Sequence, residues 1–110
     1  MKIKTKGKTE YRNKKGKLHR TDGPAIITSD GRQEYHLNGK LHRNDGPAII
    51  WPGGYQYYYQ NGELHREDGP AVIRLSGWNE YWIEGKQLKK QQYQNKNDTS
   101  SVINVNQNNQ

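Results

Sequence analysis

A twelve-residue segment that occurs three times along the chain constrains its fold more than any other feature. The three copies are GKLHRTDGPAII at Gly16–Ile27, GKLHRNDGPAII at Gly39–Ile50 and GELHREDGPAVI at Gly62–Ile73. Their first glycines are 23 residues apart, and one more step of 23 leads to Gly85. A fixed period of this length is typical of a repeat array in which each copy forms one supersecondary unit.

Each unit contains two short segments with the composition of β-strands. Pro24–Thr28 is apolar and β-branched, Ser29–Arg32 has turn composition, and Gln33–Leu37 alternates between polar and apolar residues. Asn38–Gly39 follows, and Asn-Gly is a strong hairpin signal because both residues tolerate positive φ. The pattern predicts an all-β fold, an antiparallel single-sheet β-meander built from about 3.5 tandem 23-residue hairpin repeats. Tyr35, Tyr58 and Tyr81 would form one column across it.

Composition divides the chain into three parts. Residues 1–9 are Lys-rich and are expected to form a basic N-terminal arm, disordered or weakly extended. Residues 10–90 form the repeat domain, in which the polar first unit has the character of a cap. Residues 91–110 contain five Gln and six Asn and are expected to be a disordered tail. Within this tail, Ser101–Val105 alternates and could add a strand to a sheet edge.

Composition also limits the core and the compartment. Only 29% of the 110 residues are apolar and there is no Phe, so Trp and Tyr must supply much of the buried area. The lack of Cys excludes disulfides and thiolate chemistry and fits a reducing compartment. No apolar run approaches the length of about 20 residues that spans a membrane, and the first residues lack the apolar core of a signal peptide. A cytoplasmic location, in the protein's own cell or in an infected host cell, is expected.

The net charge of +7 is concentrated at one end of the chain. Residues 1–20 hold nine Lys or Arg and one acidic residue, a net charge of +8, whereas residues 21–110 have a net charge of −1. Such an arm can contact phosphates or acidic surfaces, or it can serve only to solubilise the terminus. The repeats themselves do not form a basic groove.

The H-R-x-D-G-P-A motif has both a chemical and a structural interpretation. Equivalent residues two strands apart lie about 10 Å from each other, so the motif histidines cannot share a metal ion. No Ser or Cys accompanies them as a nucleophile, and neither catalysis, a metal nor a cofactor is predicted. In the structural interpretation, Asp caps a turn and Gly provides an unusual backbone angle. Arg forms an ion pair with Asp, and His packs against the Tyr column while donating to a carbonyl. Asp45→Ala should then cost ~1–2 kcal/mol of stability. The structural motif residues are His19, Arg20, Asp22, His42, Arg43, Asp45, His65, Arg66 and Asp68.

Aromatic residues gather in the second and third units. Strand alternation directs Tyr57 and Tyr59 to one face of a sheet and Tyr58 to the other. Exposed aromatics with flanking charges are favoured as binding anchors, although the same residues could cover a minimal core or stack on nucleobases. The candidate binding residues are Trp51, Tyr55, Tyr57, Tyr59, Trp78 and Trp82.

The pattern of Tyr, then N-G-K/E-L-H, then Gly, on a 23-residue period, resembles MORN-type repeats over about residues 10–88. NGKLHRNDGPAII is similar to the HRxDGPA variant of these repeats, found in bacterial, bacteriophage and giant-virus proteins. The resemblance implies a non-enzymatic scaffold or binding module. MORN-like proteins are associated with protein–protein contacts, with membrane-lipid contacts and, in some bacterial relatives, with an antitoxin-like role.

These observations favour a module that binds a protein partner through its aromatic face. From the family's distribution, it could be a phage or viral accessory protein that inhibits a host factor or a defence effector such as a CRISPR nuclease. The alternative is a nucleic-acid or nucleotide binder that uses the basic arm and the exposed aromatics. Two open sheet edges and an aromatic face would also allow a homodimer.

Overall fold

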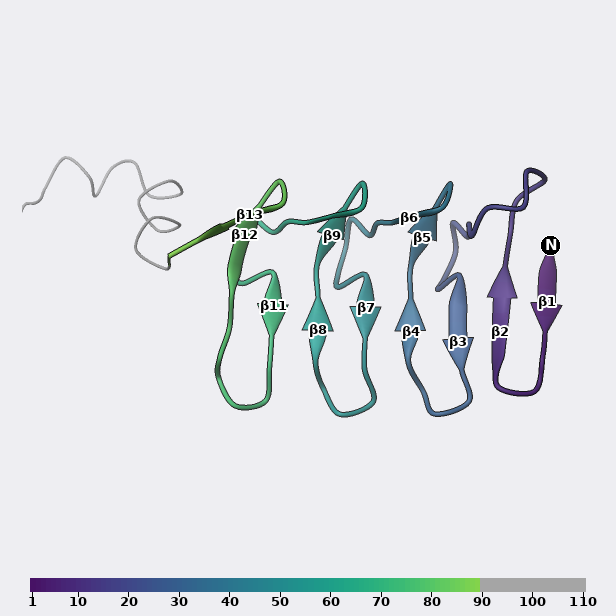
Figure 1. Ribbon diagram of the computed structural model, residues 1–110, viewed down its shortest axis with the longest axis horizontal. Helices are drawn as coiled ribbons and strands as arrows, with labels where there is room; N and C mark the ends of the chain where they lie inside the picture. The colour runs from purple at the N-terminus through teal and green to yellow at the C-terminus, as the bar shows by residue number, and fades with distance from the viewer. Residues whose placement is uncertain (90–110) are drawn as a thin grey trace, which may run out of the picture.

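The computed structural model describes residues 1–89, and over these residues the chain forms strands and turns with no helix. No membrane-spanning helix is therefore found in this part of the chain. Seven strands form one antiparallel sheet in the order β1-β2-β3-β4-β7-β8-β11 (Figure 1). They are β1 (Lys2–Lys4), β2 (Lys8–Tyr11), β3 (Ile26–Thr28), β4 (Gln33–Glu34), β7 (Ile49–Ile50), β8 (Gln56–Tyr57) and β11 (Val72–Ile73).

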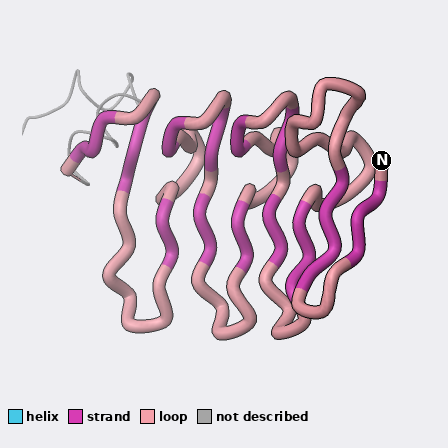
Figure 2. Tube along the Cα trace, turned by 45° about the vertical axis from the view of Figure 1, so that its right-hand side comes forward, coloured by secondary structure: helices cyan, strands magenta, loops and turns pink. Residues whose placement is uncertain are grey.

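Three two-stranded hairpins lie along one end of this sheet, the upper end in Figure 2. They pair β5 (His36–Leu37) with β6 (Lys40–Leu41), β9 (Tyr59–Gln60) with β10 (Glu63–Leu64), and β12 (Tyr81–Ile83) with β13 (Lys86–Leu88). The segment Gln33–Leu37, expected to be one strand, therefore divides at Tyr35. The Tyr35 N–H donates to the Ala48 carbonyl in the main sheet, while its own carbonyl accepts from the His42 N–H. The all-β antiparallel class is confirmed, but the strands form one main sheet with small hairpins instead of a single sheet.

The strand register places eight residues in one row across the main sheet. Each of these residues is the pairing partner of the next one, from Ile3 in β1 through β11 to Glu80, which forms a bridge with β11. The row is Ile3, Glu10, Ile26, Glu34, Ile49, Tyr57, Val72 and Glu80. Paired residues of adjacent strands point to the same side, so the row defines one face, here termed the glutamate face. The core is thin, and its fully buried side chains are small.

The first nine residues are part of the sheet. Lys2–Lys4 pairs in register with Thr9–Tyr11, and β2 in turn pairs with β3. Of the two alternatives expected for this segment, disordered or weakly extended, the structure has the extended one, because the terminal hairpin pairs its backbone groups with the repeat region. The expected tail at 91–110, with the alternating segment Ser101–Val105, lies outside the described residues.

The small hairpins turn through two residues with positive φ, as in a type I′ turn. In the first two hairpins these are Asn38–Gly39 and Asn61–Gly62. In the third, Glu84 holds the first position at φ 49°. Asn adopts this left-handed conformation more readily than Glu, because its short side chain can hydrogen-bond locally.

Glu84→Asn is therefore expected to stabilise the protein by about 0.5–1 kcal/mol, because it removes backbone strain at the turn. Thermal and urea unfolding followed by tryptophan fluorescence will measure the change. The reciprocal variant Asn61→Glu should lose a similar amount. A destabilised Glu84→Asn protein would show that side-chain interactions of Glu84 stabilise the fold by more than its backbone strain costs.

Candidate functional site

The arginine of each motif copy stacks on a tyrosine ring. The distance from Cζ to the ring centroid is 3.9–4.0 Å in all three copies. The same guanidinium donates through Nε to the motif Asp at 2.9–3.1 Å and through Nη1 to the motif Pro carbonyl at 3.1–3.2 Å. The stacked pairs are Arg20 on Tyr11, Arg43 on Tyr35 and Arg66 on Tyr58. Each arginine thus fastens its own loop to the sheet.

The motif glycine makes room for this arginine. A Cβ added to Gly46 would lie 3.0 Å from Arg43 Cζ, and the corresponding distance is 2.9 Å at Gly23 and 2.8 Å at Gly69. None of the three glycines has a positive φ. The expectation that they supply an unusual backbone angle is therefore wrong, and the close approach of the guanidinium is the reason that no side chain fits.

The motif histidine links its unit to the next hairpin. The Nδ1 atom of His42 accepts a hydrogen bond from the Asn61 backbone N–H at 3.0 Å, and the same bond joins His19 to Asn38 and His65 to Glu84 at 2.9 Å. Since Nδ1 accepts, the ring proton is on Nε2. The Nε2–H of His42 donates to Asn44 Oδ1 at 3.0 Å, and that of His65 to Glu67 Oε2 at 3.2 Å.

This arrangement corrects the expected role of the histidine. The ring face of each tyrosine is taken by arginine, and the imidazole accepts a backbone N–H in place of donating to a carbonyl. A neutral imidazole has one lone pair to accept a proton, and in all three motif copies that lone pair is already used. Among residues 1–89, no group of three or more His, Cys, Asp or Glu side chains is arranged to hold a metal ion.

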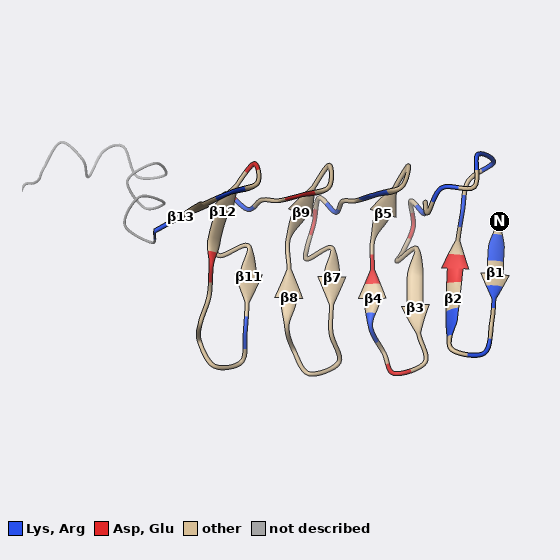
Figure 3. Cartoon of the chain, in the orientation of Figure 1, with Lys and Arg blue, Asp and Glu red and all other residues tan. Residues whose placement is uncertain are grey.

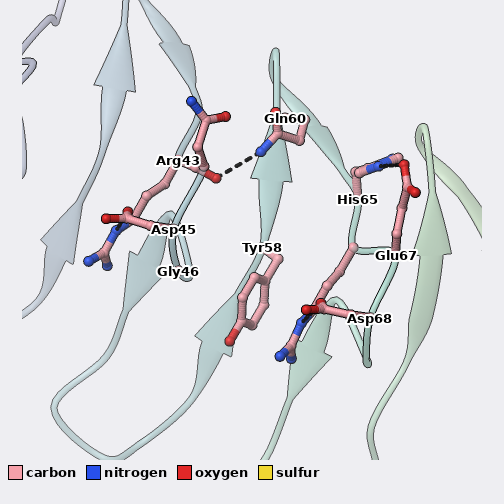
Figure 4. Close-up of a pocket in the computed structure, with 10 residues that line it drawn as sticks. Arg43, Asp45, Gly46, Tyr58, Gln60, His65, Glu67 and Asp68 are labelled. Atoms are coloured by element: carbon pink, nitrogen blue, oxygen red, sulfur yellow. Dashed lines mark hydrogen bonds and ion pairs between the residues drawn. The ribbon is translucent and has the colours of Figure 1, made fainter.

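Two polar grooves lie between consecutive motif loops. One has a volume of 340 Å³, with Tyr58 between the Arg43–Gly46 and Arg66–Asp68 loops, and the Gln60 amide in it donates to the Arg43 carbonyl at 2.8 Å (Figure 4). The other, of 530 Å³, has Tyr35 between the Arg20–Gly23 and Arg43–Asp45 loops. The arginines in both grooves are engaged by tyrosine, Asp and a carbonyl. The grooves therefore offer exposed carboxylate oxygens, and one ring face of each lining tyrosine is covered by an arginine.

The predicted aromatic residues are brought together on and beside the glutamate face. Tyr57 is a member of the row that defines this face. Tyr55 precedes it by two residues in an extended segment, so its side chain points to the same side. Trp82 Nε1 donates to Glu80 Oε1 at 2.9 Å, which places this indole on the same side. Arg32 lies 4.9 Å from the Trp51 ring centroid and 3.0 Å from Glu34, so Trp51 belongs to this face as well.

The remaining two predicted residues complete this surface. Tyr59 lies close enough to Tyr57 and Glu34 for their charges to affect its phenol, and burial is the main cause of its raised pKa. Trp78 lies at the tip of the hairpin that follows β11 and is 74% exposed. Trp51 and Tyr55 are also exposed, whereas Tyr57, Tyr59 and Trp82 are half-buried.

Leu75 is a surface residue that sequence reasoning missed. It is 72% exposed, and its Cδ2 would lie 2.9 Å from a Cβ built on Gly54, so two neighbouring hairpin tips touch there. The available signal was an apolar residue in a turn, where polar residues are usual. The six predicted aromatic residues are termed the aromatic surface: Trp51, Tyr55, Tyr57, Tyr59, Trp78 and Trp82.

Ion pairs neutralise the carboxylates of the glutamate face. Glu10 is bonded to Lys8 at 2.7 Å and to Arg12 at 3.0 Å, and these two partners hold the pKa of Glu10 below its ordinary value despite burial. Arg74 pairs with Glu80 at 2.8 Å. The face is therefore charged and locally balanced, with aromatic side chains between the ion pairs.

His36 is a second buried titratable group of this face, 7% exposed, with its Nε2 3.8 Å from Glu34. Burial lowers the pKa of His36 below 6.5, and the positive charge of Arg12 acts in the same direction while Glu34 opposes it. At pH values between the lowered pKa of His36 and 6.5, this histidine binds more protons in the unfolded chain than in the folded one. Stability should therefore decrease as the pH falls below 6.5, until it passes the folded-state pKa.

Urea unfolding at about pH 7.5 and about pH 5.5 will measure this effect, since the slope with pH reports the difference in bound protons. His36→Gln keeps a polar side chain without titration and should show a smaller loss at the lower pH than the parent protein. An unchanged pH dependence in this variant would assign the effect to other groups.

A scan against protein-family models finds no match, and neither a curated protein nor a solved structure matches the chain.

Proposed function

We propose that the chain is a non-catalytic repeat module, built from about 3.5 tandem 23-residue hairpin units, that binds a protein partner through the aromatic surface. The observation that carries the proposal is the exposure of three aromatic side chains, Trp78 at 74%, Tyr55 at 41% and Trp51 at 38%. Large apolar side chains grouped in this way on a small protein mark an interaction site.

The composition of the aromatic surface suits a protein partner. Binding energy at protein interfaces is concentrated in a few residues, with Trp, Tyr and Arg enriched among them. Here Trp and Tyr side chains alternate with the pairs Arg32–Glu34 and Arg74–Glu80, which would form a polar rim. In the grooves of the opposite side, an arginine already covers one ring face of each lining tyrosine, so these rings are less suited as anchors.

The non-catalytic part of the proposal rests on the motif contacts. The residues with the chemistry of an acid, a base or a metal ligand are used to hold loops and to join units. Arg43 bonds to Asp45, to the Pro47 carbonyl and to the Tyr35 ring, and the lone pair of His42 is taken by the Asn61 N–H. This is the role expected of structural residues in a repeat array.

The proposal is tested by comparing two matched pairs of variants in capture experiments with the tagged protein. Trp78→Ala and Trp51→Ala remove anchors of the aromatic surface, while Gln33→Ala and Gln56→Ala remove polar side chains from the same main sheet on its other face. A stoichiometric protein partner, identified by mass spectrometry and then purified, should lose about 100-fold in affinity with Trp78→Ala. The Gln variants should bind as the parent protein does.

Two results would refute the proposal. One is a partner whose affinity depends on Gln33 or Gln56 and is insensitive to Trp78 and Trp51. The other is substrate turnover by the folded protein that disappears in His42→Ala. Circular dichroism of every variant will separate a loss of binding from a loss of folding.

A further inference from the structure

Within residues 1–89, six lysines at the N-terminal end of the sheet have no carboxylate partner. All are exposed, and in the described part of the chain none of them takes part in an ion pair, whereas their neighbour Lys8 is bonded to Glu10. They are Lys2, Lys4, Lys6, Lys14, Lys15 and Lys17, termed here the lysine strip. We infer that the lysine strip is a nucleic-acid-binding surface that contacts the phosphate backbone.

The excess of positive charge lies at this end of the molecule, whereas blue and red segments are mixed along the rest of the described chain (Figure 3). Residues 1–20 have a net charge of +8, while residues 21–89 hold seven Lys or Arg and nine acidic residues, a net charge of −2. All four arginines after residue 21 in the described part are paired with carboxylates. The field of the protein is therefore strongly positive at one end, which steers a polyanion to that end.

The strip extends over the whole height of the sheet. Lys2 and Lys4 point to the same side of β1 and are about 6.8 Å apart along the strand, since each residue advances about 3.4 Å. Lys6 lies in the turn between β1 and β2, and the remaining three lysines lie in the loop that follows β2 at the opposite end. The molecule is 30 Å across in its second dimension. Duplex DNA carries one charge per about 1.7 Å of axis, so a strip of this length faces several phosphates at once.

The strip favours nucleic acid over an acidic protein. Its apolar residues are Met1 and Ile3, and the nearby Tyr11 ring is covered by Arg20 at 3.9 Å. Protein interfaces depend on several buried aromatic or apolar anchors, and this end offers only Met1 and Ile3. Binding to a phosphate backbone needs only positive charges in register with a repeating negative charge, and it is independent of base sequence.

The test is fluorescence anisotropy of the full chain with a labelled DNA duplex of about 20 base pairs, at NaCl concentrations from about 50 to 300 mM. If all six lysines contact phosphates, the slope of log K against log salt should approach about −5. Lys4→Gln/Lys17→Gln should reduce the magnitude of the slope by about 2 and weaken binding about tenfold at low salt. A change of base sequence should leave the affinity unchanged.

The matched control is Lys40→Gln/Lys86→Gln. Lys4 and Lys86 are both exposed strand lysines, and Lys17 and Lys40 pack their stems in the same way over Gly39 and Gly62. The two double variants therefore remove equal charge from equivalent settings, and the control should keep the parent slope. Three results would overturn the inference. The protein does not bind the duplex, both double variants lose the same affinity, or polyglutamate competes as effectively per charge as unlabelled DNA.

Discussion

Replacing Arg43 with alanine is expected to lower the free energy of unfolding by about 2–3 kcal/mol, because one side chain carries several interactions at once. The substitution removes the stack on Tyr35, the bond to the Pro47 carbonyl and the pair with Asp45. It exposes the Tyr35 ring to water and removes the contacts that hold the Arg43–Pro47 loop against the sheet. Urea unfolding followed by tryptophan fluorescence will measure the loss.

Two variants show which part of the arginine matters. Arg43→Lys keeps the charge but cannot stack as a plane or donate in two directions, so most of the loss should remain. Asp45→Ala should cost less than about 1 kcal/mol, because the Asp45 side chain is 87% exposed and exposed pairs contribute little. This is below the cost expected from the sequence. Equal losses in Asp45→Ala and Arg43→Ala would mean that the ion pair, and not the stack, holds the loop.

Replacing Ala48 with leucine is expected to destabilise the protein by about 2–3 kcal/mol, since extra methylene groups in a closed site force neighbouring atoms apart. Ala48 has no exposed surface, and its backbone is bonded on both sides, to Tyr35 and to Tyr57. The motif places alanine at the same position in every copy, at Ala25 and Ala71, and both are fully buried as well. Thermal unfolding will show the change as a lower Tm.

Gln56→Leu is the control for this prediction. It adds a leucine to a neighbouring strand of the same sheet at a half-buried position, where the side chain can reach solvent. Its Tm should change little. If Ala48→Leu is as stable as Gln56→Leu, the space around the motif alanine is larger than its burial indicates.

Much of the fold could be predicted from short-range chemistry. Asn38–Gly39 predicts a tight turn because both residues tolerate positive φ, and both adopt positive φ in the structure. The alternation of strand residues predicts that Tyr57 and Tyr59 share a side, and in the structure the two side chains lie close enough to interact, although the strand is interrupted at Tyr58. These features need no knowledge of what lies across the sheet.

Contacts between distant residues could not be predicted in the same way. The 23-residue period puts Arg12 in line with Tyr35, yet the structure puts Tyr11 beneath Arg20. The turn around Gly16 is one residue longer than the later turns, so the tyrosine of the first unit is displaced by one position. Likewise, the acceptor role of the motif histidine depends on a backbone N–H that lies 19 residues away, outside its own motif copy.

The terminal hairpin illustrates a different limit. Lys2–Lys4 has one apolar residue, too few to indicate a strand by periodicity. It becomes a strand because β2 presents an open edge to it, and the pairing is made by backbone groups that every sequence possesses.

The bond from each motif histidine to the following turn has a consequence for how such a chain can change in length. A unit offers an imidazole acceptor at one end and a turn N–H donor at the other, so a segment of 23 residues inserted in register would arrive with both groups that its neighbours require. Tandem duplication or deletion of a whole unit therefore preserves every such contact except at the two ends. A chain built in this way can be lengthened or shortened in evolution by recombination between its own copies, without redesign of any interface.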